Sequence, residues 1–201
     1  MLTIALAALI ISVAVPTFID INRGAAAKQA GNLVYANLNM SQQKATITRQ
    51  RVGFFIVTQV LSANPWVEAN MANRSYFVYA ADTPDVARSE NFITSVQTLP
   101  APMMFDLSTN ASASSSTIPT FEMKHPTSGV VYFRVRGFRF APAGGVHAQD
   151  WQASADSAYK FNVVITEGLP GPGGAYSAKT LKVIKYTNTV NAYTGKVVAQ
   201  R

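Results

Sequence analysis

The chain begins with MLTIALAALIISVAVPTFI (residues 1–19), an apolar run with no charged side chain before Asp20. As an α-helix this run would extend about 28 Å, close to the ~30 Å thickness of a bilayer core. A secretory signal peptide should carry basic residues before its apolar run and a cleavage site of small residues after it. Nothing basic precedes this run, and Val13-Ala14-Val15-Pro16 is a poor cleavage site. We therefore expect a permanently embedded helix, with a buried core helix as the alternative.

The following segment becomes polar but keeps helical character. Residues 25–50 are rich in Ala, Gln, Asn and Lys, several of which favour helices. Pro16 is expected to bend the helix, because its ring cannot donate the backbone hydrogen bond and clashes with the preceding turn. One apolar stripe has helical spacing, with Leu33 and Met40 beside it: Ala30, Val34, Leu38 and Ala45. We expect one long helix over residues 1–50, hydrophobic and then amphipathic, with 1–19 as its membrane part.

Residues 51–201 predict a globular domain rich in antiparallel β-structure, so the expected fold class is α+β. Its loops are expected at 107–117 and at 168–175, where small, polar, Gly and Pro residues gather. A turn at 125–129 is expected to join two strands. The expected strands are 52–61, 75–80, 92–97, 120–124, 129–140, 159–166 and 180–186, followed by a closing hairpin of 188–192 and 195–199.

Composition limits the classes of protein that fit. The 201 residues are 48% hydrophobic and 13% charged, which suits one domain with a real core plus an appendage. The chain has no cysteine, so disulfides, thiolate nucleophiles and Cys-bearing zinc sites are excluded.

Catalytic constellations are not evident in the sequence. The ten carboxylates are scattered, and no Gly-x-Ser-x-Gly elbow accompanies the two histidines. Asp82 and Asp85 are expected on a turn, His125 on another turn, and His147 on the surface. Asp150 and Asp156 flank Trp151 in an expected loop without a calcium-ligand pattern. We predict a protein that is not an enzyme and that needs no metal or cofactor.

The excess of basic residues is the remaining indication of function. The chain has 17 Lys and Arg but only 10 Asp and Glu, which gives a formal charge of +7. Arg134, Arg136 and Arg139 lie in one expected strand, and arginines beside aromatic rings can hold a nucleic-acid backbone and stack on bases. We favour a solvated strand face instead, with Phe133 and Val135 turned to the core. The candidates for nucleic-acid binding are Arg134, Arg136, Arg139, Lys182, Lys185, Lys196 and Arg201.

The charge-free helix followed by Ala14-Val15-Pro16-Thr17-Phe18 resembles the N-terminal segment of type IV pilins and type II secretion pseudopilins. The β-rich remainder and the ending Thr194-Gly195-Lys196 are similar to H-type minor pseudopilins and FimT-type minor pilins. The resemblance implies assembly through the N-terminal helix, with these residues in the membrane or filament core: Met1, Leu6, Leu9, Ile10, Val13, Pro16 and Phe18.

The same resemblance implies partners and a location. The partners would be other pilins or pseudopilins, the inner-membrane assembly machinery and, before assembly, membrane lipid. The chain would cross the bacterial inner membrane once, with its C-terminal domain periplasmic or extracellular in a filament. Three functions follow: a structural filament subunit, which we favour; a DNA-binding minor pilin for DNA uptake; and a membrane-anchored β domain unrelated to filaments. The filament system and the rank of the subunit, major or minor, stay open.

The proline spacing generates a first prediction. Aligned on Pro16, Met1 corresponds to about the seventh residue of a mature pilin, so the mature N-terminus would lie about six residues upstream, with the leader before it and the family's glutamate between it and Met1. A divergent chain with Ala5 at the glutamate position is the alternative. Mass spectrometry of the native protein from the membrane fraction should find a methylated N-terminus in that upstream segment. A native chain that starts unprocessed at Met1 would contradict this expectation.

Overall fold

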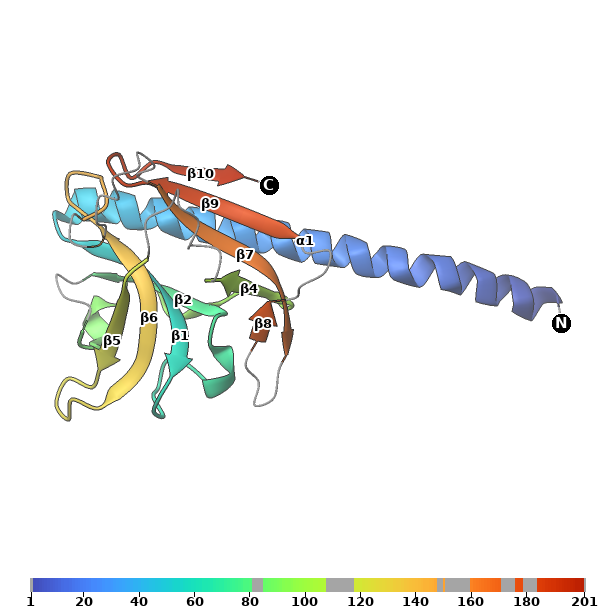
Figure 1. Ribbon diagram of the computed structural model, residues 1–201, viewed down its shortest axis with the longest axis horizontal. Coiled ribbons are helices and arrows are strands. Elements are labelled where there is room, and N and C mark those ends of the chain that lie inside the picture. Colours follow the sequence, from blue (N-terminus) through green and yellow to red (C-terminus); the bar gives the residue numbers. More distant parts are fainter. Residues whose placement is uncertain are drawn as a thin grey trace.

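In the computed structural model, α1 (Leu2–Thr48) is a single helix whose second half lies along two β-sheets while its first half projects beyond them (Figure 1). The structure describes residues 2–80, 85–107, 118–147, 150, 160–170, 176–178 and 184–200, with side chains from Ile21 onward except at 69, 170 and 176–178. The helix runs on through Pro16, and the bend there stays a prediction. It ends before Arg49, whose φ of 55° is the left-handed conformation that commonly closes helices.

The strands after α1 form two antiparallel sheets. The first sheet has the order β3-β2-β1-β6-β5, and the second has the order β10-β9-β7-β4 with β8 paired to β7. The described elements are β1 (Val52–Val60), η1 (Ala69–Met71), β2 (Ser75–Ala80), η2 (Ser89–Asn91), β3 (Gln97–Thr98), β4 (Met103–Asp106), β5 (Thr120–Lys124), β6 (Val131–Phe140), β7 (Lys160–Pro170), β8 (Tyr176–Ala178), β9 (Lys185–Asn191) and β10 (Val197–Gln200). An α+β fold with an N-terminal helix and antiparallel sheets is therefore confirmed.

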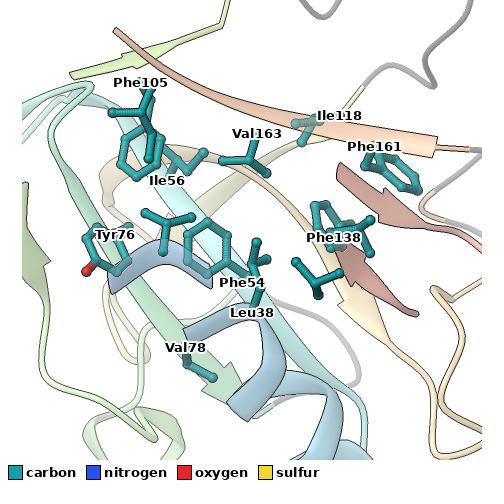
Figure 2. Packing of buried hydrophobic residues seen from close by; sticks show 14 of the residues in the cluster. Leu38, Phe54, Ile56, Tyr76, Val78, Phe105, Ile118, Phe138, Phe161 and Val163 are labelled. Carbon is teal, nitrogen blue, oxygen red and sulfur yellow. The ribbon is translucent and has the colours of Figure 1, made fainter. Parts of the chain in front are cut away.

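The main core lies where α1 and the two sheets meet. Figure 2 shows Leu38 of the helix beside Phe54 of the first sheet, with Phe161 and Val163 of the second sheet on the other side of the cluster. Phe54 pairs with Phe138 across β1 and β6, and the Phe138 ring stacks on Phe161 at 4.8 Å between centroids. Both sheets and the helix thus contribute walls to one core.

A second apolar cluster lies on the opposite face of the first sheet. Phe55, Phe77 and Phe133 are fully buried there, and the loop residues Trp66 and Phe92 cover them with stacked rings. Because this sheet is buried on both faces, β1 reads as a continuous apolar run rather than as an alternating one.

Most of the strand predictions are confirmed. The strands expected at 52–61, 75–80, 120–124, 129–140 and 159–166 correspond to β1, β2, β5, β6 and β7. The predicted turn is present, since Gly129 donates its N–H to the carbonyl of His125 with a φ of 68°. The closing hairpin is also present as β9 and β10, with Gly195 at the turn.

Three expectations are wrong in part. Residues 92–97 form no continuous strand, since Phe92 makes only an isolated antiparallel bridge to Tyr79 of β2 and only Gln97 enters β3. Residues 168–170 are not loop but the end of β7, paired with β8. The strand expected at 180–186 begins at Lys185, and 179–183 lie outside the described residues. β4 was not predicted.

Two helical glycines offer a matched stability test. A Cβ on Gly31 would lie 2.3 Å from the ring of Tyr186, whereas a Cβ on Gly24 would meet nothing within 4 Å. Gly24→Ala should raise the free energy of unfolding by up to about 1 kcal/mol through helix propensity. Gly31→Ala should lower it by about 1–3 kcal/mol, because the clash in a closed interface outweighs that gain. Chemical denaturation of both variants decides the matter, and equal stabilisation would show that the helix is not docked on Tyr186.

Candidate functional site

The second half of α1 docks on the β-domain through one stripe of small and aliphatic side chains. The predicted stripe is confirmed, with every member fully buried and Ala27 extending it toward the N-terminus: Ala30, Val34, Leu38 and Ala45. Leu33 flanks the stripe and is 37% exposed. The small residues allow close approach, and the Tyr186 ring lies directly against the Gly31 backbone.

Polar side chains fix the register of the docked helix. Gln42 donates through Nε2 to the carbonyls of Thr194 at 2.9 Å and Gly144 at 3.2 Å, which joins the helix to two turns at once. Asn188 of β9 donates to the Gly31 carbonyl at 3.3 Å, and its side chain is fully buried. These bonds define where along its length the helix sits on the sheets.

The docked half begins with an ion pair. Arg23 Nε lies 3.1 Å from Oε1 of Glu167 in β7, and the Glu167 side chain is only 7% exposed. Before Arg23, Ile21 is 61% exposed, and the helix leaves the β-domain and projects freely in Figure 1. In the described part of the chain, no helix is long and apolar enough to cross a membrane.

The predicted assembly residues belong to the projecting half of the helix. Met1 lies outside the described residues. The remaining candidates all fall within the helical backbone of α1, and their role in assembly stays a prediction: Leu6, Leu9, Ile10, Val13, Pro16 and Phe18.

Arg139, predicted as a candidate nucleic-acid contact, is buried inside the domain instead. Its guanidinium is buried and binds both carboxylate oxygens of Asp150, through Nε at 2.8 Å and Nη2 at 2.6 Å. The same carboxylate accepts the Arg139 backbone N–H at 2.7 Å, and the guanidinium lies 5.6 Å above the Phe121 ring. This pair joins Asp150 to β6 and holds the Arg139 guanidinium inside the domain.

The other described basic candidates lie on both sheets, and Arg136 Nη1 donates at 3.4 Å to the carbonyl of Leu107, next to Asp106. Arg134 pairs with Glu122 at 3.1 Å with both side chains exposed, and Arg136 lies beside it on β6. Lys185 starts β9, 3.8 Å from Asp106, while Lys196 lies beyond the other end of that strand. The two ends of β9 are six residues apart, which corresponds to about 20 Å along the strand. Lys182 and Arg201 lie outside the described residues.

The two histidines make hydrogen bonds within the fold. Nδ1 of His125 accepts the backbone N–H groups of Thr127 and Ser128 at 3.0 Å, as expected for a turn. His147 is half-buried rather than on the surface, and its backbone N–H binds the Arg139 carbonyl. Asp82 and Asp156 lie outside the described residues. No group of three metal-ligating side chains gathers among the residues that the structure describes.

A surface hollow and a buried tyrosine with a raised pKa lie in the described part of the chain. The hollow, of about 460 Å³, lies at the end of β1 and is lined by Val60, Leu61, Ser62, Ala63, Asn64, Val67 and Glu68. Within the core, burial raises the pKa of Tyr76 to about 12, so its hydroxyl stays neutral at physiological pH.

Comparison of the chain with protein-family models, with curated proteins and with solved structures found no match. Functional inference therefore depends on the sequence and on the geometry of the helix and its docking surface.

The two ion pairs of β6 give a test of burial. Asp150→Asn should lower the free energy of unfolding by about 3–5 kcal/mol, because the buried Arg139 guanidinium loses its counter-charge. Glu122→Gln, the matched control at the exposed Arg134 pair, should change it by no more than about 1 kcal/mol. Urea denaturation measures both values. Similar small effects would mean that the Arg139–Asp150 pair is solvated.

Proposed function

We propose that this chain is a pilin-like structural subunit of a type IV pilus or a type II secretion pseudopilus. The observation that carries the proposal is the division of α1: residues 27–45 dock on the β-domain, and the apolar residues 2–19 project from it (Figure 1). The molecule then has two parts, a folded β-domain and an apolar helical rod formed by residues 2–19. We expect the rod to be buried in an apolar environment outside the β-domain.

The energetics of the projecting helix indicate that environment. Each large apolar side chain of the rod contributes on the order of 1.5–3 kcal/mol when it is removed from water. The bacterial inner membrane supplies that burial before assembly, with the β-domain on the periplasmic side. The helices of other subunits supply it afterwards, so filament growth exchanges lipid contacts for helix contacts.

The DNA-binding alternative receives less support from the described basic residues. Arg139 is paired inside the domain, and Lys185 and Lys196 lie at opposite ends of β9. A phosphate backbone is held best by cations that lie along one track. The anchored β-domain remains the competing hypothesis, because it uses the same projecting helix without a filament.

A charge in the rod tests assembly. Leu9→Asp should reduce the amount of this protein in sheared filaments at least tenfold, since an aspartate in an apolar helix costs about 2.5–3.5 kcal/mol in a membrane. The measurement is an immunoblot of sheared filaments and of membranes from cells that make the full chain naturally. Val130→Asp is the matched control, because Val130 is 49% exposed on the β5–β6 turn.

The outcomes separate the two hypotheses. Loss from filaments for Leu9→Asp alone supports the filament subunit. If the natural chain is found in membranes and never in filaments, the anchored β-domain is correct. If Leu9→Asp and Val130→Asp enter filaments equally, the rod is not the assembly element.

A further inference from the structure

The ion pair between Arg23 and Glu167 lies at the point where the helix leaves the β-domain. Glu167 is in β7 and shares a strand face with Ile165 and Val163, both of which belong to the main core against α1. Its carboxylate is therefore directed to the helix side of the sheet. A buried carboxylate is stable only with a close counter-charge and hydrogen bonds, and Arg23 supplies such a charge at 3.1 Å.

Arg23 continues the docking stripe toward the N-terminus. It precedes Ala27 by four residues and so lies on the same side of the helix as Ala27 and Ala30. Its neighbours Ile21 and Asn22 are exposed, and a Cβ on Gly24 would meet nothing within 4 Å. Around this turn the helix thus has open space on its flanks and a charged contact on its docked face.

A small rotation of the helix at this turn produces a large displacement of its N-terminal end. From Arg23 to Leu2 the helix extends about 32 Å at 1.5 Å per residue, so a rotation of about 10° would move its end by more than 5 Å. Ala27 and Ala30, the stripe members nearest this turn, are buried and have small side chains. Arg23 lies one turn nearer to the projecting end, so its charged contact with Glu167 holds the helix at the point where it leaves the β-domain.

We propose that the Arg23–Glu167 ion pair is the positioning element that fixes the direction of the projecting helix relative to the β-domain. The inference concerns the geometry of one molecule, and it holds for a filament subunit and for an anchored β-domain alike. It assigns to Arg23 a role in orientation at the exit of the helix, in addition to the docking that the apolar stripe provides.

The test measures the direction of the helix by pulsed electron paramagnetic resonance. The chain has no cysteine, so Ser12→Cys and Val130→Cys introduce two unique sites for spin labels in the full chain, held in detergent micelles. One label is on the projecting helix and the other on the β5–β6 turn, away from the helix axis. The width of the distance distribution between the labels reports the spread of helix directions.

Four changes are compared in this labelled parent. Arg23→Gln should at least double the width of the distribution, and Arg23→Lys should keep it near the parent value, because the charge is retained. Arg134→Gln removes the exposed pair with Glu122 far from the helix, and it should leave the width unchanged. Glu167→Gln should widen the distribution as Arg23→Gln does. If Glu167→Gln does not fold, Arg23→Gln alone decides.

Each result has one meaning. An unchanged width in Arg23→Gln, or a lower melting temperature without a wider distribution, overturns the proposal and leaves the pair as ordinary stabilisation. Equal widening by Arg134→Gln overturns it as well. The result does not depend on filament assembly, since a wider distribution in Arg23→Gln stands even if the natural chain never enters filaments.

Discussion

Docking of residues 27–45 of α1 against both sheets is the interaction on which the remaining structure depends. The helix is not an attachment to a finished domain, because Val34 and Leu38 form part of the same core as Phe54 and Phe161. Without the helix, the inner faces of the two sheets would expose that core to water. The domain therefore needs the helix for its stability, and the helix is held by the domain at a defined register through Gln42 and its turns.

The sequence predicts this arrangement wherever the signal is local. The docking stripe follows from 3.6-residue spacing, and β1 follows from a run of aromatic and β-branched residues between polar segments. The strand expected at 92–97 is only partly formed, because Phe92 makes a single bridge to Tyr79 and its ring covers Phe77 instead of continuing a ladder. Such a use depends on a neighbour fifteen residues away in the chain, which no periodicity reveals.

The burial of Arg139 has a signal in the sequence. Its odd position in β6 places it on the side of Phe133 and Val135, which alternation already assigned to the interior. A buried arginine requires a carboxylate, and Asp150 follows eleven residues later in a segment without strand character. Part of the positive charge of the chain is thus neutralised in internal ion pairs. The net charge therefore overstates how many cationic side chains are exposed to an anion.

The docking of the helix on the last hairpin affects how the chain folds during its synthesis. Residues 27–45 are made early, but their partners Tyr186, Asn188 and Thr194 follow about 150 residues later, which is a contact of long sequence separation. During synthesis, the part of the apolar helix face that packs on β9 and β10 stays uncovered until those strands emerge. During that interval the nascent chain exposes apolar surface, so its folding competes with aggregation until the last hairpin is made.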